Sequence, residues 1–396
     1  MADSQQRGEP PLVTRDFVLI VVAHFLQALG YSSMLLLPLY LHHVGASRTE
    51  IGLAMGCAAV AGLATRPLVG WGLDRWGRKP ILVVGTVTVA LGMALVGAVE
   101  DMGPIIYLER VVFGLGVGAL FTAYFTFAAD LVPVTRRTEG LALFGVSGLI
   151  PLLVNPLSQE LGVAPADLRW FIPLLGLVVL SSLLALGPLP EPDHDPAARR
   201  PMRQAFPALA ARPLWPVWLA TSAFSALVAI FMTFATVAAE RQGVPQAPRL
   251  WLTYALGAIV VRLVGARVPD RLGPANIVAP ALGLYVAAMM VCAQATTFGG
   301  FLVGALLAGI GHGYCFPVLS SQVVTRSPQT FRGSALAFFT ALWGLSELAT
   351  APLFGAIADA HGDDAMFLTA AVGGIVSLAV WVLLEHRLGE PTPQPS

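Results

Sequence analysis

Long apolar runs separated by short polar segments make up most of the chain. Each run is close to the roughly 20 residues that a helix needs to cross the hydrocarbon of a bilayer. Only helices fit such runs, because a lone segment in lipid must satisfy its backbone hydrogen bonds internally. We expect twelve helices, at approximately residues 17–41, 51–69, 81–99, 105–129, 140–159, 170–187, 214–238, 251–266, 277–296, 299–324, 333–357 and 366–385.

One long polar interruption divides this series. Residues 190–213 hold acidic residues, arginines and several prolines, which predicts a solvated linker between six helices and six. The expected fold is therefore an all-α membrane protein with two six-helix bundles, at 17–189 and 214–386. A polar segment, 1–16, precedes them, and a proline-rich tail, 387–396, follows. The first apolar run is too long for a signal peptide, so we expect a retained helix.

An internal repeat relates the two halves. The segment that begins at Arg66 is matched by one that begins at Arg262, 196 residues later. Matching positions are Asp74, Arg75 and Gly77 in the first half and Asp270, Arg271 and Gly273 in the second. Three alternate glycines also recur, as Gly114, Gly116 and Gly118 and as Gly309, Gly311 and Gly313, and we interpret them as helix-packing positions. Two equivalent halves in a membrane usually make a transporter with its site between them.

Composition narrows the function classes. Only 12% of residues are charged, against about 25% in soluble domains, so the chain must sit in lipid. A net charge of zero and the lack of a basic motif give no reason to expect nucleic acid. No P-loop, HExxH or GxSxG motif occurs, which disfavours a nucleotide-driven pump and a hydrolase. Cys57, Cys292 and Cys315 lie in apolar runs, so we expect no disulfide framework, metal or cofactor.

The distribution of Lys and Arg predicts the orientation. With both termini inside, 18 of the 23 basic residues fall on the cytoplasmic face. We therefore expect a multi-pass protein of the cell's inner (cytoplasmic) membrane with both termini in the cytoplasm.

Several motifs resemble those of the major facilitator superfamily. Residues 70–79, GWGLDRWGRK, resemble the signature loop between helices two and three of that family, and residues 270–273 resemble its counterpart in the second half. Residues 110–118 resemble the fourth-helix motif, and residues 136–140 the start of helix five. The resemblance extends from about residue 15 to 387 and implies a twelve-helix transporter.

Within the family, the helix number, the short linker and the opening Pro38-Leu-Tyr-Leu resemble bacterial drug and metabolite exporters driven by proton antiport. Those exporters often carry Gly-Pro in helix five, where this chain has Asn155-Pro156.

The resemblance also implies an inner gate. Asp74 would meet the N-terminus of helix eleven near Gly333, and Asp270 that of helix five near Gly140, where a carboxylate stabilises the helix by about 0.3–1 kcal/mol. We expect Asp130 and Glu139 to pair with Arg75, Arg136 or Arg137. The alternative is that these charges only anchor the topology. The candidate gating residues are Gly70, Asp74, Arg75, Gly77, Arg78, Asp130, Arg136, Arg137, Asp270 and Arg271.

Glu347 is the most informative ionisable residue within an apolar run. It lies in the middle of helix eleven with no Lys or Arg within one turn. A charge in hydrocarbon costs about 2.5–3.5 kcal/mol on insertion scales, so it suggests a functional role. Glu347 could exchange a proton or receive a cationic substrate. The alternative is a protonated glutamic acid that is hydrogen-bonded to a neighbouring helix.

Three further residues are candidates for proton coupling. Arg110 stands beside Glu109 in helix four, and the family motif implies that it influences coupling; alternatively, it extends outward to the interface. His24 and His312 lie in helices one and ten, which line the central cavity of this fold. Histidine titrates near pH 6.5 and suits proton transfer, although a neutral hydrogen-bonding role is the alternative.

The expected substrate site is mainly aromatic. Gln27, one turn from His24, and aromatic residues on the candidate cavity helices suit an apolar or amphiphilic ligand, although each could simply pack or face lipid. The candidate substrate-binding residues are Gln27, Phe121, Tyr124, Phe125, Phe224, Phe231, Phe234, Tyr314, Phe316, Trp343 and Glu347.

We therefore predict a monomeric secondary transporter, not an enzyme, that exports a small, partly lipophilic molecule by alternating access and proton antiport. Its partners would be the substrate, protons and the lipid bilayer. A proton-coupled uptake symporter or a facilitator of a small metabolite is the alternative among transporters. A non-transporting membrane scaffold or an intramembrane enzyme is the alternative of another class.

Overall fold

The computed structural model describes residues 11–133, 137–191, 209–265, 268–328 and 332–388. At residues 74, 137–139, 141–142, 270–271, 274–275 and 332–333 it describes the backbone alone. Within these ranges the protein is helical, with no β-strand.

The first half contains α1 (Arg15–Ser32), η1 (Ser33–Leu36), α2 (Leu37–His43), α3 (Arg48–Arg75), α4 (Arg78–Leu95), η2 (Val96–Ala98), α5 (Pro104–Leu131), α6 (Arg137–Val146), η4 (Ile150–Leu153), α7 (Val154–Glu160), η5 (Pro165–Asp167) and α8 (Leu168–Leu186). The second half contains η8 (Arg212–Leu214), α10 (Trp215–Arg241), η9 (Ala247–Arg249), α11 (Leu250–Val264), α12 (Val268–Leu272), α13 (Pro274–Gln294), α14 (Phe298–Arg326), α15 (Arg332–His361) and α16 (Asp363–Leu388).

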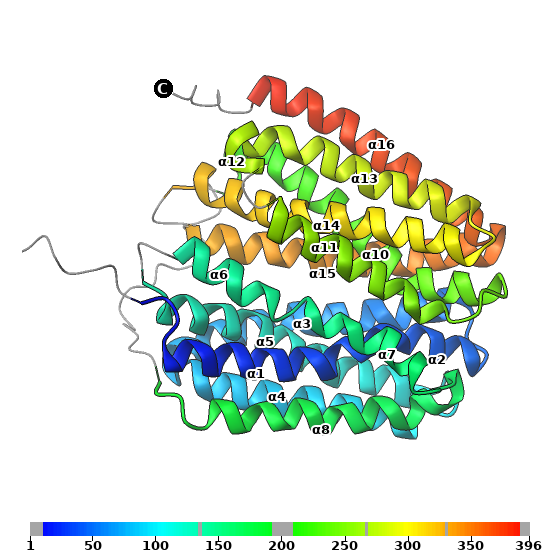
Figure 1. Ribbon diagram of the computed structural model, residues 1–396, viewed down its shortest axis with the longest axis horizontal. Coiled ribbons are helices and arrows are strands. Elements are labelled where there is room, and N and C mark those ends of the chain that lie inside the picture. The colour runs from blue at the N-terminus through cyan, green and yellow to red at the C-terminus, as the bar shows by residue number, and fades with distance from the viewer. Residues whose placement is uncertain (1–10, 134–136, 192–208, 266–267, 329–331, 389–396) are drawn as a thin grey trace, which may run out of the picture.

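The two halves form two bundles that lie side by side along their length. In Figure 1, α1 to α8 make one bundle, and α10 to α16 make the other. The start of α1 and the end of α16 lie at the same end of the molecule, which we call the terminal end. The opposite end, where α2 ends and α3 begins, is the far end. This arrangement confirms the predicted all-helical fold of two bundles.

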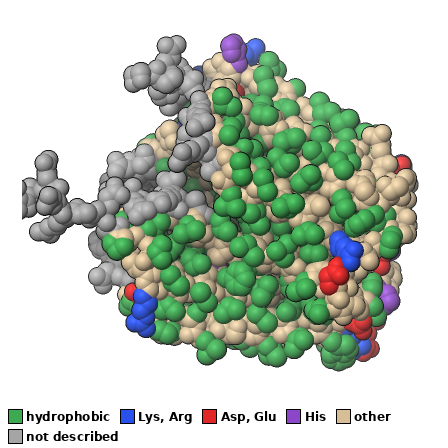
Figure 2. All heavy atoms as spheres, viewed as in Figure 1, with side chains coloured by type: hydrophobic (Ala, Val, Ile, Leu, Met, Phe, Trp, Pro, Cys, Tyr) green, Lys and Arg blue, Asp and Glu red, His purple; other side chains and the backbone are tan. Residues whose placement is uncertain are grey.

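Eleven helical segments of the described chain are long and apolar enough to cross a membrane. Figure 2 shows a surface that is mainly hydrophobic, with its few charged side chains mostly toward the two ends. Such a surface fits a protein whose middle is surrounded by lipid.

The fifth expected helix, 140–159, is not continuous, and that prediction was wrong in detail. The chain forms α6 and α7 with a turn and η4 between them. After Val146 the backbone N–H groups of Ser147 and Gly148 donate to carbonyls three residues back, not four. Pro151 has no N–H to donate, and Gly145 and Gly148 lower the helix propensity, so the helix breaks at this point.

The repeated glycines are packing positions, as expected. Each stands where a Cβ atom would meet a neighbouring helix. A Cβ at Gly114 would clash with the carbonyl oxygen of Ala58 in α3, and a Cβ at Gly118 would lie 2.5 Å from that of Gly62. Gly116, on another face of α5, lies against Val89 in α4. Alternate glycines therefore let α5 approach two helices at backbone distance.

The second bundle repeats this packing. A Cβ at Gly309 would clash with the carbonyl oxygen of Tyr254, and a Cβ at Gly313 would lie 3.0 Å from that of Ala258, both in α11. Gly311 faces Ala281 in α13. The internal repeat of the sequence thus specifies the same three-helix contact twice.

The bundles meet along α3 and α15, which run antiparallel. A Cβ at Gly52 would clash with the carbonyl oxygen of Ala351, and a Cβ at Gly355 would clash with that of Arg48. On the other flank, η4 and α7 contact α11 and η9. The first flank therefore holds the two bundles together by direct backbone contact.

The glycine packing can be tested with Gly114→Ala. We expect the added methyl group to lower the free energy of unfolding by about 1–3 kcal/mol, the usual cost of overpacking, because the facing atom belongs to the backbone. The measurement is Tm in detergent. Gly283→Ala is the control, since nothing lies within 4 Å of its Cβ position in α13. Equal Tm values for the two variants would contradict the assignment.

Candidate functional site

Glu347 lies on α15, which packs against α3 of the first bundle and α10, α14 and α16 of the second. Its side chain is half-buried. Within the described part of the chain, its carboxylate makes no hydrogen bond or ion pair. It is close enough to Arg110 of the first bundle for the two charges to interact. Glu347 and Arg110 are thus opposite charges on the two bundles, within electrostatic range of each other but not in contact.

Arg110 is held by its neighbour in α5. Its Nε and Nη2 atoms each donate to a carboxylate oxygen of Glu109 at 2.5 Å. Both side chains are almost fully buried, at 1% and 0% exposure, so Arg110 does not extend to the interface. A buried guanidinium requires such a partner, because an unpaired one would cost several kcal/mol. Glu109 therefore fixes the orientation of Arg110 and offsets part of its charge.

An aromatic stack continues this polar cluster. The guanidinium of Arg110 lies over the ring of Phe113, with 4.6 Å between its carbon and the ring centre. Tyr31 of α1 stacks on the same ring with centroids 5.7 Å apart. Tyr31 also lies within electrostatic range of both Arg110 and Glu347. No pattern in the sequence pointed to Tyr31, because its position depends on three helices meeting.

His24 lies in a packed pocket of the first bundle. Its Nδ1 is 2.6 Å from the hydroxyl of Ser147, which itself donates to the carbonyl of Phe144. A hydroxyl has one proton, so the ring N–H of His24 is the donor to Ser147. Tyr124 and Phe144 pack on the imidazole at 5.0 and 4.4 Å. His24 thus binds the turn that follows α6.

His312 has a comparable setting in the second bundle. Its Nδ1 is 2.6 Å from the hydroxyl of Tyr254 in α11. Phe224 of α10 and Trp343 of α15 pack on its ring, with centroids 5.3 and 5.9 Å apart. Trp343 stands one helical turn from Glu347, so this aromatic cluster adjoins the carboxylate.

The predicted aromatic residues fall into two groups. Those in the packed interior are Tyr124, Phe224, Phe231 and Phe234, each nearly fully buried, with Gln27 also buried. Those with some exposure are Phe121, Phe125, Tyr314, Phe316 and Trp343. Phe316 contacts Trp343 at 5.6 Å, and Phe121 contacts Phe125 at 5.1 Å. The exposed group is the better placed of the two to meet a ligand.

Two repeat-related arginines lie at the contact between the bundles. Arg66 of α3 donates to the carbonyl and hydroxyl oxygens of Thr340 in α15. The Arg262 guanidinium comes within 3.6 Å of a Cβ position at Gly145, and it lies in electrostatic range of His312. The apolar runs and the charge distribution predict neither contact, because each joins helices from different halves of the chain. Their matching places in the repeat were the signal that could have identified them.

The loop after α3 is tied within its own bundle. Arg78 pairs with Asp130 at the end of α5, at 2.9 Å. Of the arginines expected to pair with Asp130 or Glu139, the side chains of Arg136 and Arg137 lie outside the described residues. Unlike Arg78, Arg75 does not pair with Asp130: it lies over the ring of Trp71, 5.5 Å from its centre. The two arginines are separated by a turn at Gly77, whose φ of 91° suits glycine, so they point in different directions.

Glu191, after α8, caps the start of α4. The backbone N–H groups of Arg78 and Lys79 donate to its carboxylate. The Lys79 ammonium donates to the carbonyls of Gly187 and Leu189. These contacts fasten the signature loop to the end of α8.

The other predicted gate contacts lie outside the described residues. Arg136 falls in an undescribed segment, and of Asp74, Arg137, Glu139, Asp270 and Arg271 only the backbone is described. Gly70 lies within α3. In the described ranges no group of three His, Cys, Asp or Glu side chains could hold a metal ion.

A family model described as Major Facilitator Superfamily matches residues 20–298 and again residues 250–396. The MFS-type transporter STM4428 of Salmonella typhimurium is 28% identical over 369 residues, covering 89% of this chain and 92% of that protein. The inner membrane transport protein YajR of Escherichia coli is 25% identical over 361 residues, covering 88% of this chain and 77% of YajR.

Solved structures share the fold. The nucleoside transporter NupG matches with a TM-score of 0.76 at 14% identity, covering 94% of this chain and 99% of NupG. The human organic anion transporter MFSD10 matches with a TM-score of 0.69 at 19% identity, covering 94% of this chain and 100% of MFSD10.

The setting of His312 predicts the effect of Tyr254→Phe. Removing the hydroxyl leaves the buried Nδ1 of His312 unpaired, which should cost about 1–3 kcal/mol of stability. Tm in detergent measures this loss. Tyr314→Phe is the control, since the Tyr314 hydroxyl makes no hydrogen bond within the described chain. A loss no larger than that of the control would show that the hydrogen bond contributes little.

Proposed function

The chain belongs to the major facilitator superfamily, and on that premise we propose that it is a proton antiporter that exports a small, partly lipophilic molecule. The protein is a multi-pass membrane transporter. Antiport, export and the nature of the substrate are our proposal. The observation that carries it is the state of Glu347: a half-buried carboxylate between the bundles with no hydrogen bond or ion pair in the described chain.

A carboxylate in this position can carry a proton. The group is far from the polar ends of α15, where a fixed charge is costly and a neutral acid is not. Because Arg110 belongs to the other bundle, the charge of Glu347 affects how strongly the two bundles attract each other. Ionised Glu347 is attracted toward Arg110, and protonated Glu347 is not. Gain or loss of a proton therefore changes the attraction between the bundles.

Arg110 is suited to this role because Glu109 holds it in place. The bidentate pair fixes the guanidinium in α5, so that the mobile partner is Glu347. A substrate with a cationic group would compete with the proton for Glu347. Competition for one site is a sufficient basis for exchange of a substrate for a proton, provided that the site faces one side of the membrane at a time.

The proposed substrate follows from the surroundings of Glu347. Trp343 stands one turn away and contacts Phe316, and both are partly exposed. Aromatic walls with one polar group favour a ligand with an apolar body. We include Glu347, Trp343 and Phe316 in the proposed binding site, together with Phe121 and Phe125 of α5.

We further propose that the protein acts as a monomer in the inner membrane with both termini in the cytoplasm. The excess of Lys and Arg at the terminal end supports this orientation. The terminal end is then cytoplasmic, and the far end is external.

The proposal predicts a loss of proton exchange in Glu347→Gln. Purified protein in liposomes, with a pH-sensitive dye inside and an imposed proton gradient, would receive lipophilic cations, neutral drugs or polar metabolites. We expect a lipophilic cation to dissipate the proton gradient in liposomes that contain the natural protein. In the variant the rate should fall by on the order of 10²-fold, as when a proton-transfer group is removed.

Glu100→Gln is the control, since it removes an exposed carboxylate that pairs with Arg169 at the far end. Proton movement that persists in Glu347→Gln would transfer the proton role to His24, His312 or Arg110. Accumulation of substrate along with protons would identify an uptake symporter. Substrate movement without protons would refute antiport.

A further inference from the structure

Asp359 of α15 caps the first turn of α3 from the opposite bundle. Its two carboxylate oxygens accept hydrogen bonds from the backbone N–H groups of Arg48 and Thr49, at 2.9 and 2.8 Å. The Thr49 hydroxyl also donates to Asp359, at 2.6 Å. The first N–H groups of a helix have no partner within the helix, so an external carboxylate is a strong partner for them.

The rest of this turn is satisfied locally. Ser47 and Glu50 form a reciprocal capping box, in which each side chain accepts from the other residue's backbone N–H. Ser47 and Glu50 belong to the first bundle, so they move with α3. If the bundles separate, α3 keeps this capping box but loses Asp359, which among the described residues is the partner of this turn from the other bundle.

Arg48 reinforces the contact through its side chain. Its guanidinium pairs with Asp359 at 3.4 Å and with Asp363 of α16 at 3.2 Å. Arg241 of α10 also pairs with Asp363, at 3.3 Å. The side chains of Arg48 and Asp363 are only 14% and 11% exposed, so water screens this pair less than it does an exposed one.

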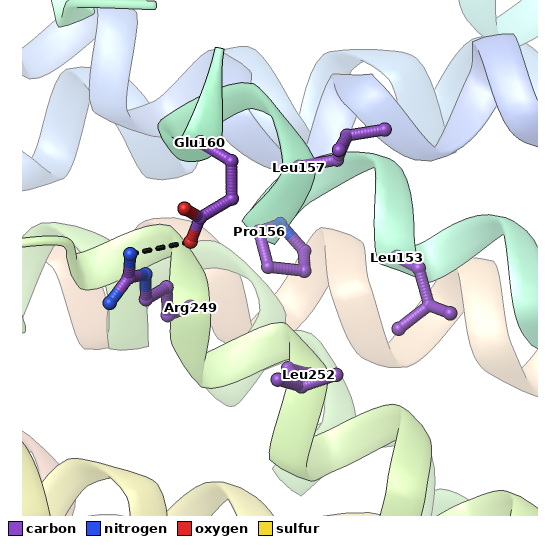
Figure 3. Close-up of a pocket in the computed structure, with 6 residues that line it drawn as sticks. All are labelled: Leu153, Pro156, Leu157, Glu160, Arg249 and Leu252. Atoms are coloured by element: carbon purple, nitrogen blue, oxygen red, sulfur yellow. Dashed lines mark ion pairs between the residues drawn. The ribbon is translucent and has the colours of Figure 1, made fainter. Parts of the chain in front are cut away.

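The other flank of the same end carries a second ion pair between the bundles. Glu160 at the end of α7 pairs with Arg249 of η9 at 2.5 Å, beside a pocket of about 400 Å³ (Figure 3). The charges are reversed there: the first bundle contributes the acid and the second the base. Both flanks of the far end are thus closed by electrostatic contacts.

We propose that Asp359, Arg48 and Thr49 form a far-end latch that holds the transporter closed on this side and opens when the bundles rock apart. The close backbone approach at Gly52 and Gly355 brings α3 and α15 near enough for the latch to form. The inference rests on alternating access in the proposed transporter, but not on its substrate, direction or coupling ion.

The latch lies at the far end of the α3–α15 pair, and the contact expected of Asp74 lies at the terminal end of the same pair. Because α3 and α15 run antiparallel, the C-terminal turn of each lies beside the N-terminal turn of the other. Asp359 occupies the last turn of α15, and Asp74 occupies the last turn of α3. The family resemblance assigns Asp74 to the start of α15, so Asp359 would be its counterpart at the other end. Alternation would then exchange one capped helix for the other.

The test is a pair of distances between spin labels in Asp359→Asn. In a background with Cys57, Cys292 and Cys315 replaced by alanine, one label pair is placed at Asp101→Cys and Thr296→Cys, at the far end. A second pair is placed at Val13→Cys and Leu272→Cys, at the terminal end. Double electron–electron resonance spectroscopy of the protein in liposomes then gives each distance distribution in the absence of substrate.

We expect Asp359→Asn to raise the population with a longer far-end distance by on the order of threefold or more and to shorten the terminal-end distance. The matched control is Asp364→Asn, an exposed aspartate close by that makes no ion pair in the described chain, and it should leave both distributions unchanged. Thr49→Val removes one of the hydrogen bonds and should give a smaller shift in the same direction, including if Asp359→Asn does not fold.

Unchanged distributions in both latch variants would overturn the proposal. A far-end increase without any terminal-end decrease would also overturn it, because it would indicate local loosening of α3 and not rocking of the bundles. Neither result would affect the proton measurement with Glu347→Gln, so failure of the latch can be distinguished from failure of the antiport proposal.

Discussion

Backbone-to-backbone contact between helices is the constraint on which this structure depends. In lipid, apolar side chains gain little from contacting each other instead of acyl chains, so close packing and polar contacts must hold the helices together. Gly114 and Gly309 provide the closest contacts within the two bundles, and Gly52 and Gly355 provide them between the bundles. The polar contacts between the bundles lie where these approaches bring helices together. Asp359 reaches α3 only because the backbones already touch.

The ionisable residues of the interior differ in how far they are neutralised. Glu109 and Arg110 form a closed pair, whereas His24 and His312 are each bound to a hydroxyl and packed among rings. Glu347 is the member of this set without such a partner in the described chain. In the proposed antiport, a change in the charge of Glu347 would alter its attraction to Arg110 and hence the relative position of the bundles.

Much of the fold could be predicted from the sequence, since eleven spans, the two bundles and the glycine contacts follow from apolar runs and a repeat. The break in the fifth span could not, because proline and glycine are often tolerated inside membrane helices. The pairing of Asp130 with Arg78, not Arg75, depends on the direction of the chain after Gly77. Sequence identified Glu347 by the lack of a nearby base. It could not identify Arg110 as the opposing charge, because the two residues lie more than 200 positions apart in the chain.

The break between α6 and α7 has a consequence for how the protein is made. Neither piece is long enough to span the hydrocarbon alone, and the turn between them leaves backbone groups that lipid cannot satisfy. The segment η4 contacts α1 and α11, and α7 contacts α11 and η9. The contacts of the fifth span with the second half can therefore form only after α11 has been synthesised. While only the first half has been inserted, these contacts are absent, so the final packing of the fifth span depends on a helix of the second half.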